Sequence, residues 1–349
     1  MAGPSPVTGL LRLTPSLLDN NLVKLPKHVG YASASAVALV PANDLPLGGD
    51  GAMKRTTELG GGQLAGGKVT GVSACTIGEE AYLVVSSQQG ARIFDGATGA
   101  RLLFSLRMPA DRDLFGGAKP PARYADNGAF CTAACAARSN DGRTQIVVGT
   151  SAGALLVVAV DGTRFSHSHT VKAGGEDGAH ASPVTALGAD AVAAAAGDAR
   201  REVATVGGDG DVVVWAPRSA SQYEAYWRLP DTSPCAGVAV RGALLYVGRR
   251  DGRLSIYDTT SKSLVHDIVA HSRLLSSLTV HPRLPYVATT SEDTTVAVWR
   301  IADGAVSCAL SAKWPTALLT GSAFLDDGGV AVAAYDVAEL RVYGGVTVP

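Results

Sequence analysis

Histidine and aspartate side chains recur in this sequence at spacings that could support acid–base chemistry. His180 precedes Asp209 by 29 residues, and His271 precedes Asp293 by 22 residues. An imidazole titrates near neutral pH, so it can transfer protons or, in its neutral form, bind a metal ion. Buried histidine–aspartate pairs also occur in structural hydrogen-bond networks, in which each member satisfies another. Which role applies here depends on the elements that carry the two pairs.

A second group of residues has the composition of a metal site. His167 and His169 alternate, so a regular strand would present both imidazoles on one face. His180, Glu176 and Asp177 lie within the next eleven residues, across a glycine-rich segment. A zinc site needs three or four protein ligands. Because a loop would have to supply the remaining ligands, we expect no bound metal, and the sequence indicates no cofactor.

The sequence offers little for phosphate or acid–base catalysis. Gly66, Gly67 and Lys68 superficially resemble a phosphate-binding loop, but Val69 follows the lysine and no helical pattern begins there. Such a loop binds phosphate at the start of a helix. The chain also lacks a pair of carboxylates at a recognisable catalytic spacing. We therefore expect that the protein is not an enzyme.

Short apolar runs dominate the chain, as in residues 81–85 and 154–158, and clusters of Gly, Asp, Asn and Pro separate them. Runs of about four to eight such residues between turn signals are typical of β-strands. They are far shorter than the roughly 18 apolar residues of a membrane-spanning helix. The 41 glycines suit many tight turns. The sequence thus predicts an all-β protein with no membrane insertion.

A repeat becomes visible when strand-ending aromatic residues are aligned. Four of them are spaced by 42, 42 and 44 residues: Trp215, Tyr257, Trp299 and Tyr343. An aspartate precedes each of the first three by six residues: Asp209, Asp251 and Asp293. A period of about 40–45 residues is typical of four-stranded propeller blades. The sequence therefore predicts a single β-propeller domain over residues 1–349.

Seven four-stranded blades fit the chain best. Strand ends near residues 94 and 158 precede the four aligned ones, and residues 31–59 offer material for an irregular N-terminal blade. A propeller must close its ring, and a strand near residues 10–13 could pair with residues 340–343, so that the N- and C-terminal strands share one blade. Gaps longer than one period imply inserted surface loops, which we place at 107–127, 161–179 and 189–201.

The aromatic repeat and the two His–Asp pairs resemble the WD-repeat family. In that family a His before the first strand of a blade is linked through a Ser or Thr to the Trp of the third strand, beside the turn aspartate. The resemblance implies two such structural networks, with Thr290 or Ser291 as the hydroxyl of the second: His180, Asp209, Trp215 and His271, Asp293, Trp299. Asp251 and Tyr257 make a third set without a histidine. The resemblance assigns these residues to holding blades in shape.

Several segments outside the shared blade pattern resemble one narrower group within that family. They are Asn20-Asn21-Leu22, Ala270-His271-Ser272-Arg273, Glu292-Asp293-Thr294 and the terminal run from Tyr335 to Arg341. The terminal run is the most specific, because ordinary blades do not require it. This resemblance implies a cytoplasmic adaptor without known chemistry, linked to signalling complexes or to cilia.

Charge and cysteine content narrow the choice of partner. Thirty Lys and Arg residues balance 31 Asp and Glu residues, so no field of one sign attracts nucleic acid or an acidic membrane. Arg249-Arg250 is similar to the paired arginines of phosphoinositide-binding propellers. However, Asp251 follows the pair and offsets its charge, which argues against lipid binding. The five cysteines are irregularly spaced and indicate a reducing compartment.

These observations favour a scaffold or adaptor that binds other proteins through loops on a rigid ring. The candidate partner-binding residues are Arg249 and Arg250 near one rim, with Asp336 and Glu339 near the last blade. The alternative is a small-molecule or metal-dependent site in the central channel, either in an enzyme or in a ligand binder. Such a site needs acidic or His residues that converge on one mouth of the channel. The predicted first strands carry small or apolar residues instead, as in 236–240.

Overall fold

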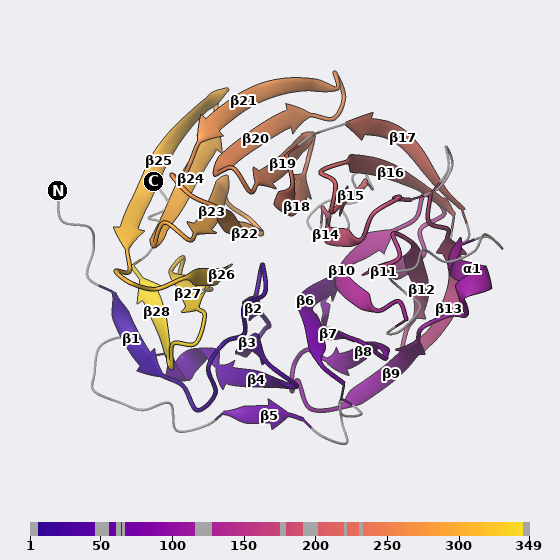
Figure 1. The fold of residues 1–349 in the computed structure, drawn as a ribbon, viewed down its shortest axis with the longest axis horizontal. Helices are drawn as coiled ribbons and strands as arrows, with labels where there is room; N and C mark the ends of the chain where they lie inside the picture. The colour runs from indigo at the N-terminus through magenta and orange to yellow at the C-terminus, as the bar shows by residue number, and fades with distance from the viewer. Residues whose placement is uncertain are drawn as a thin grey trace.

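The computed structural model contains seven four-stranded sheets, arranged as blades around a central channel (Figure 1). The structure describes residues 6–45, 56–60, 64, 67–115, 128–174, 179–190, 202–219, 222–229 and 233–344. All strand pairs within the blades are antiparallel, and the predicted seven-bladed all-β propeller is confirmed. Within the described residues, no helix has both the length and the apolar character needed to cross a bilayer.

Blades 1 to 3 follow one another along the first half of the chain. Blade 1 consists of β2 (Val23–Lys24), β3 (His28–Ser33), β4 (Ala36–Pro41) and β5 (Thr57–Leu59), with η1 (Ala42–Asp44) after β4. Blade 2 consists of β6 (Val69–Ile77), β7 (Glu80–Ser87), β8 (Gly90–Asp95) and β9 (Leu102–Arg107), followed by α1 (Asp111–Phe115). Blade 3 consists of β10 (Cys131–Arg138), β11 (Thr144–Thr150), β12 (Leu155–Asp161) and β13 (Arg164–Val171). Blade 1 is irregular, as expected, because its innermost strand has only two residues.

Blades 4 to 6 have the regular pattern, and blade 7 combines both ends of the chain. Blade 4 consists of β14 (Val184–Ala189), β15 (Val203–Gly207), β16 (Val212–Ser219) and β17 (Gln222–Leu229). Blade 5 consists of β18 (Cys235–Arg241), β19 (Leu244–Arg249), β20 (Arg253–Asp258) and β21 (Ser263–Val269). Blade 6 consists of β22 (Leu275–Val280), β23 (Tyr286–Ser291), β24 (Thr295–Ala302) and β25 (Ala305–Lys313). Blade 7 consists of β26 (Leu319–Phe324), β27 (Val330–Ala334), β28 (Glu339–Tyr343) and β1 (Val7–Leu10).

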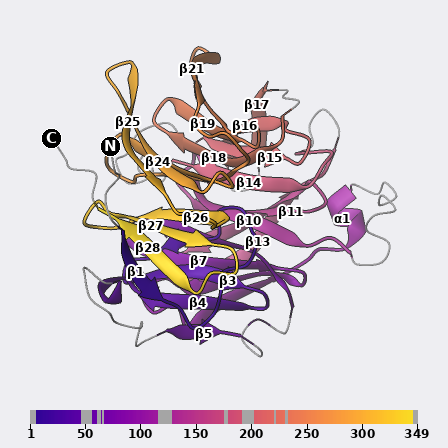
Figure 2. The same cartoon turned by 60° about the vertical axis from the view of Figure 1, so that its left-hand side comes forward.

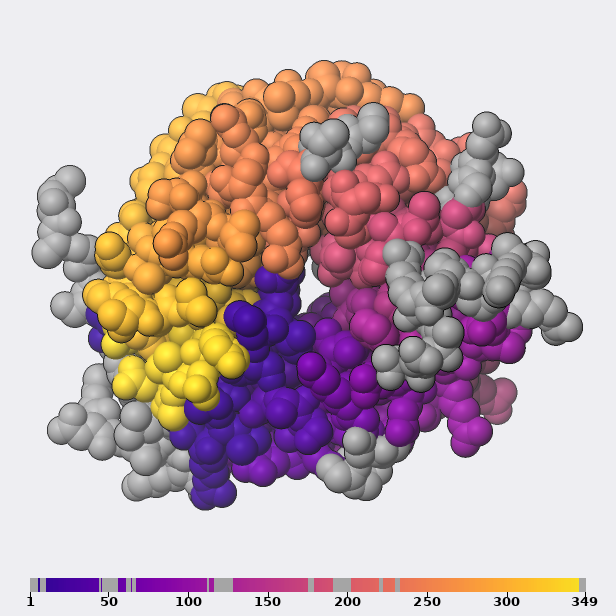
Figure 3. Space-filling model, viewed as in Figure 1, coloured from indigo at the N-terminus to yellow at the C-terminus, as the bar shows by residue number. Residues whose placement is uncertain are grey.

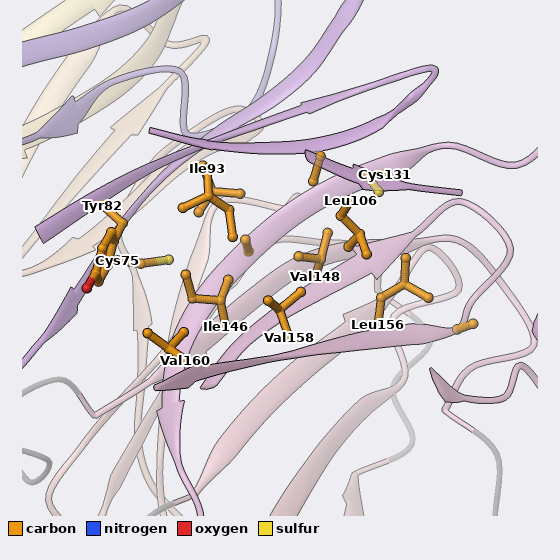
Figure 4. Packing of buried hydrophobic residues seen from close by; sticks show 14 of the residues in the cluster. Cys75, Tyr82, Ile93, Leu106, Cys131, Ile146, Val148, Leu156, Val158 and Val160 are labelled. Atoms are coloured by element: carbon orange, nitrogen blue, oxygen red, sulfur yellow. The ribbon is translucent and has the colours of Figure 1, made fainter. Parts of the chain in front are cut away.

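The hydrophobic core lies between neighbouring blades, which explains why the middle strands are apolar on both faces. In β12 the first four residues are all buried, whereas the outer strand β21 is mostly exposed. One core cluster joins Ile93 of blade 2 to Ile146 and Val158 of blade 3 (Figure 4). Burial of each such side chain stabilises the fold by about 1.5–3 kcal/mol. Packing between blades therefore keeps the ring rigid.

The ring is closed by a pairing between the two ends of the chain. β1 lies antiparallel to β28, with Val7 opposite Val342 and Leu10 opposite Glu339 (Figure 1 and Figure 2). The paired strand begins three residues before the segment 10–13 that the sequence suggested. The hydrogen bond from the Leu11 amide to the Ala338 carbonyl (2.9 Å) continues the contact beyond the strand.

Two of the three predicted loops differ from expectation where the structure describes them. Residues 164–171, inside the predicted loop 161–179, form β13, the outer strand of blade 3. This strand lacks an apolar run because an outer strand leaves one side open to solvent, and most of its residues are exposed or half-buried. Helix α1 lies inside the predicted loop 107–127. Most of the predicted loop 189–201 lies outside the described residues.

Six innermost strands share an irregularity at the same end of the channel. Each of β6, β10, β14, β18, β22 and β26 has a register shift just after its first residue. A bulge leaves its extra residue outside the ladder of the sheet. In β10 two residues, Thr132 and Ala133, lie between the paired positions. We call the residue directly after the first paired residue of each strand its mouth bulge: Thr70, Thr132, Thr185, Ala236, Ser276 and Thr320.

Deletion of residues 1–14 should lower the melting temperature by several degrees, because it removes β1 and leaves β28 with an unpaired edge. In domains of 150–250 residues, a loss of about 1 kcal/mol lowers Tm by roughly 2–4 °C. Calorimetry of the full chain, of this deletion and of a control deletion of residues 1–5, which precede β1, makes the comparison. An unchanged Tm in the longer deletion would contradict closure of the ring by β1.

Candidate functional site: blade networks and the channel mouth

In blade 6, His271, Asp293, Thr289 and Trp299 form one buried hydrogen-bond network. The Trp299 indole donates to the Thr289 hydroxyl (3.0 Å), which also contacts Nε2 of His271 (2.8 Å). Nδ1 of His271 lies 3.2 Å from an Asp293 carboxylate oxygen. Asp293 in turn accepts hydrogen bonds from the amides of Ser272 and Thr295, both at 2.9 Å. The network therefore ties the segment before β22 to the turn between β23 and β24.

The hydroxyl in this network belongs to Thr289, so the expectation of Thr290 or Ser291 was wrong. Val287 lies opposite Trp299 across the ladder, and Thr289 follows two positions later on the same face. Thr290 lies on the opposite face, where its hydroxyl contacts that of Ser276 (3.1 Å). Ser291 lies on the same face of β23 as Thr289 but two residues further from the indole. Its hydroxyl accepts from the Asp293 amide (3.0 Å).

Blade 4 repeats the inner part of this network. The hydroxyl of Thr205 accepts from the Trp215 indole (2.8 Å) and contacts Nε2 of His180 (2.7 Å). Its aspartate arrangement differs, because the carboxylate facing Nδ1 of His180 is that of Asp211 (3.7 Å). Asp209 instead accepts from the Asp211 amide (3.2 Å) and shapes the turn.

The glycine at 207 allows this turn to approach the histidine. A Cβ at Gly207 would lie 2.5 Å from an Asp209 carboxylate oxygen and 2.8 Å from Nδ1 of His180. Both distances are shorter than carbon makes with such atoms, so a larger residue would push the network apart. The local sequence Gly207-Gly208-Asp209 thus serves the packing of the histidine.

Both histidines are held neutral by their surroundings. Burial lowers the pKa of His180 to about 4, assisted by the charge of Arg228 and opposed by that of Asp209. Burial also lowers the pKa of His271, against the opposing effect of Asp293. The two side chains are fully buried. They hold blades in shape and lie out of reach of a substrate.

Blade 5 replaces the histidine network with an arginine. The Arg249 guanidinium donates to the Ser255 hydroxyl (2.8 Å) and to the Tyr257 hydroxyl (2.6 Å). Ser255 donates to Asp267 (2.8 Å), and Asp251 accepts from the Arg253 amide (3.1 Å) in the turn. The Arg249 guanidinium therefore forms hydrogen bonds within its own blade.

The other three candidate partner-binding residues also contact the N-terminal segment or the closing blade. Arg250 forms an ion pair with Asp19. Asp336 accepts from the Thr14 hydroxyl (3.2 Å), and its amide donates to the Pro15 carbonyl (3.1 Å). Glu339 lies 3.6 Å from the guanidinium of Arg341, its neighbour along β28. Of the four, Arg250 borders the central cavity.

The central channel is a cavity of about 870 Å³, and an N-terminal segment crosses one of its mouths. We call residues 16–22 the strap. Asn20 donates from its side chain to the Ala236 carbonyl (2.8 Å) and from its amide to the Ser276 carbonyl (3.0 Å). Asn21 donates from its amide to the Thr320 carbonyl (2.9 Å). The strap thus binds the mouth bulges of blades 5, 6 and 7.

Charged groups gather where the strap meets blade 5. Burial raises the pKa of Asp19 to about 6, although the charge of Arg250 lowers it; the nearby charge of Glu292 raises it further. Asp19, Arg250 and Glu292 all border the cavity. No local pattern in the sequence indicates this cluster, because its members come from the strap, blade 5 and blade 6.

The histidines that were weighed as metal ligands do not lie together in the part that the structure describes. A bulge in β13 places His167 opposite Val158 and His169 opposite Val157, so the two imidazoles do not share one face. His169 packs against Tyr223, with ring centroids 5.6 Å apart. Glu176 and Asp177 lie outside the described residues. Among the residues described, no three His, Cys, Asp or Glu side chains are grouped to hold a metal ion.

Residues 149–153 have the Gly-x-Ser-x-Gly spacing of a hydrolase nucleophile, but they form the end of β11 and the turn that follows it. An elbow that exposes a catalytic serine joins a strand to a helix, whereas this turn joins β11 to β12. Ser151 is 2% exposed, and its hydroxyl accepts from the Phe130 amide (2.9 Å). The serine is therefore a structural part of blade 3.

Replacement of Thr289 by Val should destabilise the protein by about 2–4 kcal/mol, because it leaves a buried indole N–H and a buried imidazole nitrogen without their common partner. Thr205→Val should have a similar effect through Trp215 and His180. Urea unfolding measures both. Thr290→Val is the matched control, and an equal loss in this variant would show that the hydroxyl at 289 has no special role.

Stability should fall as the pH drops from about 6.5 to about 4, because the unfolded chain protonates His180 in this range while the folded chain keeps it neutral. The contribution of the neutral His180 to the free energy of unfolding is fully present above pH 6.5, and the loss at low pH amounts to roughly 3 kcal/mol. Asp19 acts with the opposite sign, since its raised folded pKa favours the folded state as the pH falls from about 6 towards 3.8. The unfolding free energies of the wild type and of His180→Gln, measured over this pH range, separate the effect of His180 from that of Asp19. Equal pH slopes would contradict a buried neutral His180.

Comparison with known proteins agrees with this geometry. A rat protein, WD repeat domain 54, is 26% identical over 210 residues, which cover 58% of this chain and 60% of that protein. Mouse WD repeat-containing protein 54 is 23% identical over 352 residues, which cover 96% of this chain and 97% of that protein. A chain in a crystal structure of the Mitotic Checkpoint Complex superimposes with a TM-score of 0.71 at 16% identity, covering 98% of this chain and 95% of the other.

The narrower resemblance that the sequence indicated is confirmed by a family model, whose match includes the terminal run but begins after the strap. The model of the WDR54 family matches residues 29–346, which run from β3 to β28 and include parts of all seven blades. Together with the seven blades and the histidine networks, this match shows that the chain belongs to the WDR54 family of WD-repeat propellers.

Proposed function

We propose that this protein is a non-catalytic scaffold or adaptor that binds other proteins at the mouth of its channel. The observation that carries the proposal is the charged surface that Asp19, Arg250 and Glu292 form around the strap. The Arg250 and Asp19 side chains are 40% and 30% exposed, so a partner can reach them. The buried polar side chains of blades 4 and 6 hold the turns that support this rim.

The proposal places the protein in the cytoplasm, and in its narrower form within a ciliary or signalling complex. The nearly balanced charge favours proteins over nucleic acid or lipid as partners. Arg250 is the main candidate residue for contact with a partner protein. Arg249, Asp336 and Glu339 support the rim through contacts within the chain, and charge changes at these positions would act on the fold as well as on binding.

A ligand site in the channel is the alternative, and the raised pKa of Asp19 beside a cavity is the observation that favours it. The ion pair with Arg250 gives that carboxyl a structural partner. A scaffold therefore accounts for the same geometry without a reaction.

Affinity purification of the tagged protein from its own cells, followed by mass spectrometry, tests the proposal. Arg250→Glu should lose a small stoichiometric set of proteins that the wild type retains, because it reverses a charge at the rim. Arg253→Glu is the matched control in the same blade, where the arginine pairs with Asp267 (2.6 Å). Recovery of the bare chain from wild-type cells would favour the ligand alternative over the scaffold.

A further inference from the structure

A second cavity, of about 620 Å³, lies at the outer edge of the propeller, away from the channel opening at the centre of Figure 3. Its walls come from β9 and β13, the outermost strands of blades 2 and 3, and from α1. Helix α1 packs against the end of β13, where the Ala173 amide donates to the Leu114 carbonyl (3.0 Å) and Leu114 is buried (Figure 1). The segment inserted between the two blades therefore forms one wall of this cavity, which we call the edge pocket.

Part of the edge pocket is apolar and is held in place by aromatic packing. Phe104, Leu106 and Pro109 line it. The ring of Phe104 stacks on that of Phe165, with centroids 6.0 Å apart, and Tyr82 and Phe165 make a T-shaped pair with centroids 5.5 Å apart. Such a lining is typical of sites that bind an apolar group beside a few polar contacts.

The bulge in β13 turns one histidine towards this pocket. His167 lies opposite Val158 and Thr170 lies opposite Leu156, and both of these opposing residues belong to the core between blades 2 and 3. Nε2 of His167 lies 3.2 Å from the Thr170 hydroxyl, and both side chains line the pocket. The bulge therefore adds an imidazole and a hydroxyl to the apolar wall.

Two cationic side chains reach the edge pocket from different blades. Arg107 is the last residue of β9, and Lys172 directly follows β13. Both residues are exposed, and neither side chain forms a hydrogen bond or an ion pair with another residue that the structure describes. Asp113 on α1 also lines the pocket, so the positive charges of the lining exceed the negative ones by one when His167 is neutral. An anion would give these cations the partner that they lack.

A phosphate monoester matches these groups better than a carboxylate does. It carries a charge of about −1.5 to −2 at pH 7 and three acceptor oxygens, so a guanidinium and an ammonium can bind it together. A guanidinium forms two parallel hydrogen bonds with such a group, and an ammonium adds a point charge. The apolar wall selects what carries the phosphate, because an aromatic ring packs on Phe104 better than a short polar side chain does.

We infer that the edge pocket binds a phosphotyrosine side chain of a partner protein, with its phosphate on Arg107 and Lys172 and its ring against Phe104. The inference goes beyond the proposed function, because the pocket is separate from the channel mouth and adds a contact that depends on phosphorylation.

Fluorescence anisotropy with the full chain tests the edge pocket. The probe is a labelled peptide, Gly-Leu-Tyr-Leu-Gly, with a phosphate on its tyrosine. It should bind the wild type, and the same peptide without phosphate should bind about tenfold or more weakly. Arg107→Met and Lys172→Met should each weaken binding of the phosphopeptide about tenfold, the effect of one lost charge-assisted hydrogen bond. Lys172→Arg keeps the charge and should bind like the wild type.

Arg101→Met and Arg164→Met are the matched controls. Arg101 directly precedes β9 and Arg164 begins β13, so each variant removes one positive charge from the same two strands at the ends away from the pocket. Both controls should bind the phosphopeptide like the wild type. The Tm of Arg107→Met and of Lys172→Met should equal that of the wild type, because neither side chain has a partner among the described residues.

Four results would overturn the inference: no binding of the phosphopeptide, an equal loss of binding in the control variants, equal binding of a phosphoserine peptide of the same length, or binding of phenyl phosphate as tight as that of the phosphopeptide. The third result would show that the aromatic ring has no role, and the fourth would place the ligand among small phosphate esters. Arg250→Glu alters the channel mouth and should leave phosphopeptide binding unchanged. Loss of binding in that variant would place the peptide at the mouth and contradict the inference.

Discussion

Closure of the ring by β1 determines the path of the whole N-terminal segment. β1 is the outermost strand of blade 7, whereas β2 is the innermost strand of blade 1. Residues 11–22 must therefore run from the outside of the propeller to its channel across one end. Along this path Tyr31 donates to the Leu13 carbonyl (2.7 Å), and Asn21 donates to the Ser16 and Ala32 carbonyls (2.9 and 3.0 Å). The strap is a consequence of how the ring closes.

The buried polar networks serve this same end of the molecule. His271 and Asp293 fix the turn that carries Glu292, and Arg249 lies beside Arg250 in blade 5, whose buried network contains no histidine. In blade 6 both ring nitrogens of His271 have hydrogen-bond partners, and such a connected network makes the turn that it holds rigid. A rigid rim lowers the entropy that a partner must overcome on binding. Fold stability and the proposed binding function therefore depend on the same side chains.

Much of the fold could be predicted from the sequence, because strand-ending aromatics and turn aspartates are local signals that repeat. Thr205 and Thr289 each precede their tryptophan by ten residues, so the correct hydroxyl was also visible in the spacing. β13 was mistaken for a loop because an outer strand lacks an apolar run. The strap could not be predicted, since Asn20 bonds residues 216 and 258 positions away. Only the closed ring brings these groups together.

Amide hydrogen exchange of the chain, alone and with its purified partner, tests most directly the claim that partners bind at the channel mouth. The account predicts slower exchange in the complex in the strap and in the turns that carry Arg250 and Glu292, with the outer strands β21 and β25 unchanged. Protection confined to β21 and β25, with no change at the mouth, would contradict it and would place the partner on the outer edge of the propeller.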